Sequence, residues 1–137
     1  MDGGDPGPVT LSLPADLEAH ADDYAQLTSP GVYALRLEKP DAPEWAIAET
    51  WDVWPSWGDE FVAADAIAYV GASSNVLGRL EDHRDGEVRK AALLRICEID
   101  GIHSVWFYDD VDLAFDREWQ HATKLQHERP AWYVHSR

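Results

Sequence analysis

The sequence predicts an α+β fold in which helices flank a small antiparallel sheet of three strands. Three observations lead to this prediction. The chain has 137 residues, which suits one domain with a single core. Short stretches alternate apolar and other side chains, as strands do, and longer stretches repeat apolar residues at helical spacing. Hydrophobic residues make up 45% of the chain, which is enough to build a core.

The N-terminal part is predicted to lie outside the sheet. Residues 1–10 are rich in Gly, Pro and Asp, which is typical of a loose segment. Apolar residues at helical spacing then predict a short helix over residues 14–27, and Pro30 ends it. We therefore expect an N-terminal segment over residues 1–29 and one domain over residues 30–137.

The first strand is predicted over residues 32–37, where side chains alternate, and a turn follows it. Residues 45–51 look extended and residues 54–59 look like an aromatic loop, so we expect an insertion at about residues 40–64. The tryptophans of this insertion are Trp45, Trp51, Trp54 and Trp57. We expect them to form a small core that closes a long hairpin. Stacking on nucleic-acid bases and binding of a protein partner are the alternatives.

The second strand is predicted over the apolar residues 66–70. A helix is expected to begin at Ser73 or Ser74, because serine is a good N-cap, and to end at Asp85 and Gly86.

A second helix is predicted over residues 88–99 and a third strand over residues 103–108. The last helix is expected to be capped by Asp112 and to run to about His127, since Pro130 prevents its continuation. Phe115 and Trp119 lie along one side of this helix.

The net charge of −15 comes from 26 acidic and 11 basic residues. Taken alone, this charge argues against binding to nucleic acid or to an anionic membrane. The low number of lysines and the excess of aspartate are typical of haloarchaeal proteins, in which surface carboxylates maintain solubility in high salt. An ordinary protein with an acidic partner-binding face is the alternative. The balance is locally positive over residues 79–95.

The single cysteine and the N-terminus exclude several classes of protein. Cys97 cannot form a disulfide within the chain, and it lies in an apolar run, so we expect a buried hydrophobic residue rather than a nucleophile. The acidic N-terminus has no apolar segment typical of a signal peptide, and no stretch is long enough to cross a membrane. The expected location is the cytoplasm.

The first predicted strand contains the tripeptide Gly31-Val32-Tyr33, and the second contains Tyr69-Val70-Gly71. Arg79 follows Tyr69 by ten positions, His83 follows one helical turn later, and Glu118 lies on the last predicted helix. This pattern resembles the GIY-YIG nuclease family over about residues 31–133. The resemblance implies the family's fold and a DNA endonuclease that hydrolyses phosphodiester bonds in repair, recombination or a mobile element.

The chain departs from the family pattern at three points. The two motif tyrosines are separated by the long insertion, Ala72 stands where a lysine is frequent, and Tyr133 stands at the position of the closing asparagine. These changes affect the residues expected to contact the substrate more than the residue expected to hold the metal.

The resemblance implies a role for each motif residue. Glu118 would hold one Mg²⁺ or Mn²⁺ ion, and Arg79 would bind the scissile phosphate through two parallel hydrogen bonds. His83 would donate to the phosphate or hold the attacking water. Tyr33 and Tyr69 would accept the proton of that water, position it, or only pack across the strands. Further contacts to DNA are expected from Arg84, Arg89, Lys90 and Tyr133.

Two other functions compete with the metal-dependent endonuclease. One is a catalytically inactive module on the same scaffold that binds nucleic acid or protein, which the missing asparagine and the acidity favour. The other is a halophilic scaffold with no nucleic-acid role. His121, His127 and His135 do not have the spacing of a zinc site.

Overall fold

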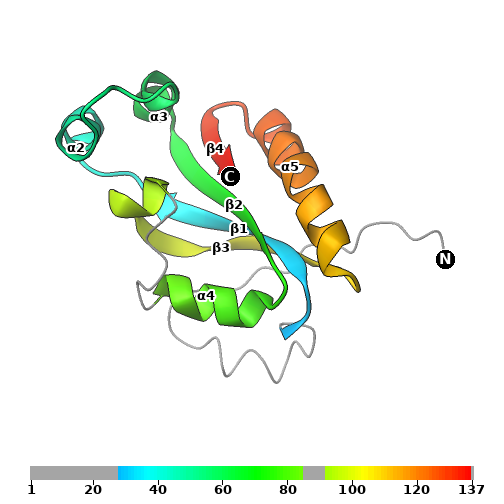
Figure 1. The fold of residues 1–137 in the computed structure, drawn as a ribbon. Coiled ribbons are helices and arrows are strands. Elements are labelled where there is room, and N and C mark those ends of the chain that lie inside the picture. The colour runs from blue at the N-terminus through cyan, green and yellow to red at the C-terminus, as the bar shows by residue number, and fades with distance from the viewer. Residues whose placement is uncertain (1–27, 85–91, 137) are drawn as a thin grey trace.

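The computed structural model describes residues 28–84 and 92–136, so the predicted helix over residues 14–27 lies outside the described part. The structure is α+β, with a four-stranded mixed sheet between helices (Figure 1). The strands are β1 (Gly31–Glu38), β2 (Ala66–Ser73), β3 (Glu98–Phe107) and β4 (Trp132–Ser136). The helices are α2 (Pro43–Thr50), α3 (Gly58–Ala63), α4 (Val76–Arg84), η2 (Ala92–Arg95, 3₁₀) and α5 (Val111–Glu128).

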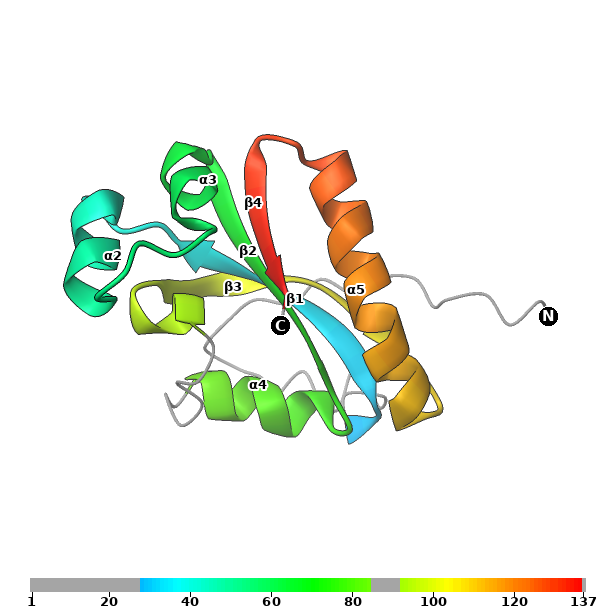
Figure 2. The same ribbon diagram turned by 45° about the horizontal axis from the view of Figure 1, so that its top comes forward.

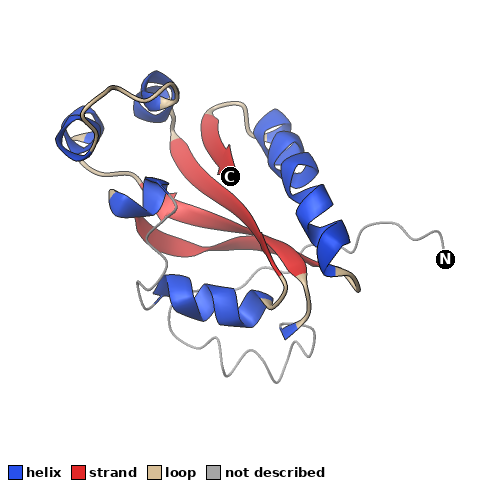
Figure 3. Ribbon diagram, viewed as in Figure 1, coloured by secondary structure: helices blue, strands red, loops and turns tan. Residues whose placement is uncertain are grey.

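The prediction of a purely antiparallel three-stranded sheet is wrong in one respect. The strand order is β3-β1-β2-β4, and β1 pairs antiparallel with both β2 and β3. The fourth strand, β4, follows α5 and pairs parallel with β2, which makes the sheet mixed (Figure 3). Pro130 ends the helix as predicted, but the aromatic and β-branched residues after it then form this short strand.

Three other predicted elements differ from the structure. Residues 43–50 are helical rather than extended, because Pro43 stands at the start of the helix and Glu44 in its first turn, both of which favour a helical N-terminus. The expected loop at residues 54–59 is shorter than predicted, because Gly58 and Asp59 already belong to α3. The predicted helix over residues 88–99 is wrong in its described part, which holds only the 3₁₀ turn η2 before residues 98–100 enter β3.

The helix caps are also shifted from their predicted positions. Asn75 rather than a serine caps α4, because its Oδ1 accepts a hydrogen bond from the Gly78 N–H at 3.0 Å. Asp110 rather than Asp112 caps α5, since its Oδ1 accepts from the Asp112 N–H at 3.2 Å.

The sheet buries both of its faces. Tyr33, Leu35 and Tyr69 belong to a core with Val76 and Leu80 of α4. The alternate residues of the same strands, such as Val32, Ala34 and Val70, belong to a second core with Ala114, Ala122 and Leu125 of α5. Figure 2 shows α4 and α5 on different sides of the sheet. We call these the α4 face and the α5 face.

The insertion is divided between core and surface. Trp51 and Trp57 pack edge to face at 5.2 Å between ring centroids and contact the core on the α4 face, as the small-core interpretation predicts. Trp45 and Trp54 are 66% and 43% exposed, so they are not part of that core.

The side of α5 that carries Phe115 and Trp119 faces solvent, although both of these side chains are apolar. Phe115 and Trp119 are 42% and 69% exposed, whereas Ala114, Glu118 and Leu125 face the sheet. Within the described residues, no helix combines the length and the apolar character needed to cross a membrane.

Candidate functional site

The two motif tyrosines lie on the α4 face, next to each other. In the register of β1 and β2, Tyr33 is opposite Gly71 and Leu35 is opposite Tyr69, so Tyr33 and Tyr69 are diagonal neighbours. Their ring centroids are 6.4 Å apart. The ring of Tyr33 lies directly over Gly71, where an added Cβ would be 2.5 Å from the tyrosine hydroxyl oxygen. The second tripeptide therefore needs its glycine because the tyrosine of the first occupies the space of a side chain.

The helix after β2 brings His83 to these tyrosines. Val76 and Leu80 are fully buried on the inner side of α4, and His83 follows them at helical spacing. The Tyr33 hydroxyl oxygen is 3.0 Å from His83 Nε2. The His83 ring centroid is 5.6 Å from that of Tyr33 and 6.0 Å from that of Tyr69. The predicted grouping of these three side chains is therefore present in the structure.

His83 is neutral at neutral pH. Its pKa is lowered to about 4, mainly by burial and also by the nearby Arg79 guanidinium, while Asp82 opposes the shift. A neutral ring has one N–H and one acceptor nitrogen, so Nε2 accepts from the Tyr33 hydroxyl when the proton is on Nδ1. Nδ1 is buried and has no hydrogen-bond partner among the described residues. The ring is therefore placed to take a proton from Tyr33.

This buried histidine predicts a loss of stability in acid. The unfolded chain protonates His83 near its ordinary pKa of 6.5, whereas the folded chain does so near 4. Between these values the unfolded state binds more protons, so the free energy of unfolding falls as the pH falls and levels off below 4. Urea unfolding at pH 7 and at pH 4 measures the effect. Between these two pH values we expect the free energy of unfolding of the wild type to fall by about 2–3 kcal/mol more than that of His83→Gln. Equal pH dependence in the two proteins would contradict this.

Arg79 lies one turn before His83 on α4 and is half-buried, whereas Tyr33, Tyr69 and His83 are buried. It is thus the most accessible of these four predicted residues. The Arg79 guanidinium is close enough to His83 to lower the pKa of the histidine. A phosphate that binds Arg79 would offset its charge and raise the pKa of His83.

Strand β4 adds two residues to the α4 face that matter to this cluster. His135 is opposite Tyr69 in the parallel register, and their rings stack with centroids 6.2 Å apart. The Tyr133 hydroxyl oxygen is 2.7 Å from His135 Nδ1, so a second tyrosine–histidine pair adjoins the first. Burial raises the pKa of Tyr133 and lowers that of His135. Tyr133 was expected at the substrate; His135 was missed, although it alternates with Tyr133 along a short strand.

Glu118 lies on the other side of the sheet. It belongs to the buried stripe of α5 with Ala114, Ala122 and Leu125, and is 6% exposed. Because α5 packs on the α5 face, the sheet separates Glu118 from Tyr33, Tyr69 and His83. A single ion bound to Glu118 and acting at the Tyr33–His83 pair does not fit this arrangement. Among the described residues, no three His, Cys, Asp or Glu side chains are grouped to hold a metal.

The α5 face carries a tyrosine–histidine pair of its own. The Tyr108 hydroxyl oxygen is 2.6 Å from His121 Nε2, and both side chains are buried. This pair is chemically matched to Tyr33 and His83 but lies on the opposite side of the sheet.

The remaining predicted contacts to DNA cannot be placed. Arg89 and Lys90 lie outside the described residues, and so does the side chain of Arg84 at the end of α4. Cys97 is buried, as predicted, and burial raises the pKa of its thiol to about 12. It is therefore protonated and a poor nucleophile at neutral pH.

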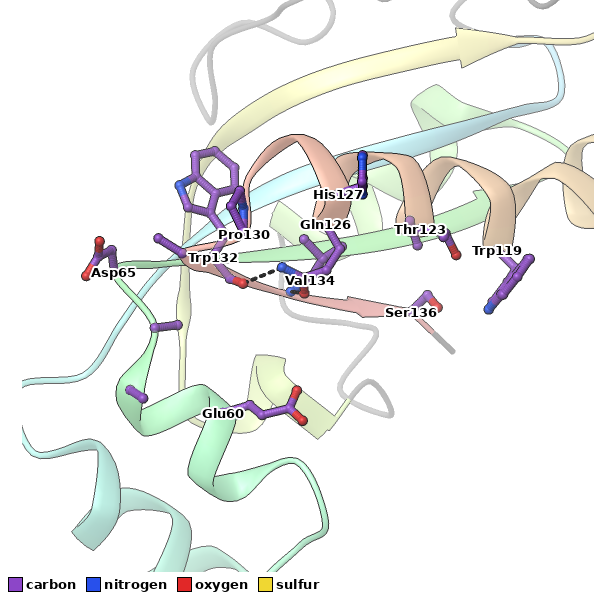
Figure 4. A pocket seen from close by; sticks show the side chains of 14 residues that line it. Glu60, Asp65, Trp119, Thr123, Gln126, His127, Pro130, Trp132, Val134 and Ser136 are labelled. Atoms are coloured by element: carbon purple, nitrogen blue, oxygen red, sulfur yellow. Dashed lines mark hydrogen bonds between the residues drawn. The ribbon is translucent and has the colours of Figure 1, made fainter.

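A cavity of about 1060 Å³ lies between α5, β4 and the end of α3 (Figure 4). On its floor, the Gln126 side chain accepts from the Val134 N–H at 2.9 Å and donates to the Trp132 carbonyl at 2.6 Å. Gln126 thus satisfies backbone groups of the edge strand β4, which otherwise invite pairing with another chain. None of the predicted site residues that the structure describes lines this cavity.

Comparison of the chain with protein-family models, with curated proteins and with solved structures finds no match in any of the three.

Proposed function

We propose that this protein is a nuclease that hydrolyses phosphodiester bonds in DNA at the α4 face. The observation that carries the proposal is the hydrogen bond between the Tyr33 hydroxyl and His83 Nε2, with Tyr69 beside it and Arg79 one turn away. These four residues are the ones that the resemblance to the GIY-YIG family assigns to the reacting phosphate.

The chemistry needs a proton acceptor for the attacking water and a cation at the phosphate. A tyrosine with an ordinary pKa near 10 is ionised in only about one molecule in a thousand at pH 7, which costs roughly 4 kcal/mol. Tyr33 need not be ionised beforehand if it takes the water proton while it passes its own proton to His83 Nε2, as the water oxygen attacks phosphorus and the bond to the leaving oxygen breaks. At a pKa of about 4, protonation of His83 costs a similar amount at pH 7, so this route requires the pKa of His83 to rise when the substrate binds. Arg79 binds the phosphate and neutralises part of the charge that develops on it.

The binding of the phosphate strengthens His83 as a base. In the free protein its pKa is about 4, and Arg79 contributes to that low value. An anion at Arg79 cancels this contribution, so the pKa of His83 moves toward neutral pH when the substrate is bound. Substrate binding and proton transfer are thereby coupled through one pair of residues.

A module that binds nucleic acid or protein without cutting is the second candidate. The burial of Tyr33 and His83 and the position of Glu118 across the sheet favour it. In that case the exposed Trp45 and Trp54 are the residues that we expect to contact bases or a protein partner.

The test is incubation of the protein with labelled linear, nicked, flap and four-way DNA in molar KCl, with Mg²⁺, Mn²⁺ or a chelator. We expect cutting by the wild type and its loss in Arg79→Ala. Arg95→Ala is the matched control, because Arg95 is an exposed arginine on η2 that lies over Trp51 instead. Binding without cutting would favour the module, and neither binding nor cutting would refute both functions.

The metal is tested in the same experiment. The resemblance assigns Mg²⁺ or Mn²⁺ to Glu118, which stays a prediction. If the chelator abolishes cutting by the wild type and Glu118→Gln also abolishes cutting, the ion acts from the α5 face. If Glu118→Gln cuts normally, Glu118 is not its ligand.

A further inference from the structure

A second cavity, of about 490 Å³, lies on the α5 face beside strand β3. It is on the flank of α5 away from the cavity in Figure 4. Its volume is in the range of small-molecule sites. Residues from β1, β3 and α5 line it, and none of them belongs to the proposed nuclease site.

The lining is cationic in a strongly acidic protein. Arg36 of β1 and Lys124 of α5 line the cavity, and Lys124 is one of only three lysines in the chain. Arg129 is close to the lining residue His103, because it contributes to the low pKa of that histidine. Of the described residues that line the cavity, only Glu128 carries a carboxylate. Such a set of charges attracts an anion.

The cations are held by an aromatic side chain. The guanidinium carbons of Arg36 and Arg129 are 5.4 and 5.5 Å from the centroid of the Trp132 ring, which is the distance of a cation–π contact. His103 contacts the same ring edge to face at 5.6 Å. Because Trp132 contacts the guanidinium of the lining residue Arg36, Arg36 loses less conformational freedom when it binds an anion.

A bulge in β3 forms the wall of the cavity. Ala34 is opposite Ser104, but its neighbour Leu35 is opposite Ile102, so His103 is an extra residue in β3. The next pair is Arg36 and Gly101, and an added Cβ at Gly101 would meet nothing within 4 Å. The strand is therefore open beside Arg36, where an anion would approach.

The opposite wall is aromatic. Trp106 lines the cavity, is half-buried, and stacks on His121 with ring centroids 4.0 Å apart and planes at 20°. A tryptophan supported in this way offers a rigid surface for a planar ring.

We propose that this cavity binds a nucleoside phosphate, with Arg36 and Lys124 at the phosphate and Trp106 against the base. The ligand is either a free mononucleotide or the phosphorylated end of a nucleic-acid strand, which present the same chemistry. The proposal does not depend on nuclease activity, because the cavity lies across the sheet from Tyr33 and His83.

The experiment is isothermal titration calorimetry of the full chain with AMP, adenosine and inorganic phosphate. We expect AMP to bind at least tenfold more tightly than adenosine or phosphate, and Arg36→Gln and Lys124→Gln each to weaken AMP binding at least tenfold. Arg95→Gln is the matched control. Arg95 lies over the Trp51 ring at 5.5 Å, much as Arg36 lies over the Trp132 ring, but Arg95 and Trp51 are on the α4 face of the sheet. Circular dichroism melting verifies that each variant is folded.

A second titration distinguishes the two sources. Tetrathymidylate with a 5′-phosphate is compared with the same strand without it. Tighter binding of the phosphorylated strand than of AMP supports a strand end, and the reverse order supports a free mononucleotide. The proposal is overturned if neither AMP nor the phosphorylated strand binds, if adenosine or phosphate binds as tightly as AMP, or if Arg95→Gln weakens AMP binding as much as Arg36→Gln.

Discussion

Tyr33→Phe is expected to lower the rate of DNA cleavage by a factor of about 100 or more. The substitution removes only the hydroxyl that is 3.0 Å from His83 Nε2 and leaves the ring over Gly71. Under the proposed mechanism this hydroxyl passes the proton of the attacking water to His83, and loss of such a group typically costs two to four orders of magnitude. Single-turnover cleavage of an end-labelled DNA measures the change.

Tyr108→Phe is the control for this prediction. It removes the same hydroxyl from the Tyr108–His121 pair, whose oxygen and nitrogen are 2.6 Å apart, on the opposite face of the sheet. Each variant loses one buried hydrogen bond, which costs about 1–3 kcal/mol of stability in either case. We therefore expect similar shifts in melting temperature but normal cleavage by Tyr108→Phe. Equal cleavage rates in the two variants would refute the role of Tyr33.

Gly71→Ala is expected to lower the free energy of unfolding by about 1–3 kcal/mol. The new Cβ would be 2.5 Å from the hydroxyl oxygen and 2.7 Å from Cζ of Tyr33, closer than atoms in contact approach. The Tyr33 ring is 2% exposed and bonded to His83, so it cannot move away without breaking that hydrogen bond. The variant should lose both stability and the arrangement of the site.

Gly101→Ala separates this steric effect from the general effect of alanine in a strand. Gly101 is also on a strand of the sheet, but a Cβ there would meet nothing within 4 Å. We expect its free energy of unfolding in urea to stay within about 0.5 kcal/mol of the wild type. A comparable loss in both variants would show that contact with Tyr33 is not the cause.

Local patterns in the sequence, together with the family resemblance, predicted the centre of the site. Alternation placed β1 and β2, and two glycine–tyrosine tripeptides on neighbouring antiparallel strands were expected to bring the tyrosines together. The stripe on α4 then placed His83 at helical spacing from buried residues. Periodicity predicts the strands and the helical spacing of His83, whereas the grouping of His83 with the two tyrosines was expected from the resemblance to the GIY-YIG family.

Elements with competing signals were predicted less well. Residues 43–50 contain Trp45 and Ile47, which favour a strand, but Pro43 and Glu44 start a helix. The Asp100–Gly101 pair resembles a helix end, yet β3 continues through it because two irregularities in the register absorb the extra residues. At residues 43–50 one local signal outweighed another, whereas in β3 the pairing with β1 outweighed the local preference for a helix end.

The sequence by itself determined the α+β class, and the resemblance it carries led to the expected grouping of Tyr33 and Tyr69 with His83. Only the tertiary structure decided that β4 lies parallel to β2, that His135 therefore stacks on Tyr69, and that Glu118 faces the opposite side of the sheet. The physical reason is that helical spacing sets which side of α5 is buried. The path of the chain from β3 to β4 decides which face of the sheet α5 covers, and local patterns in the sequence do not predict that path.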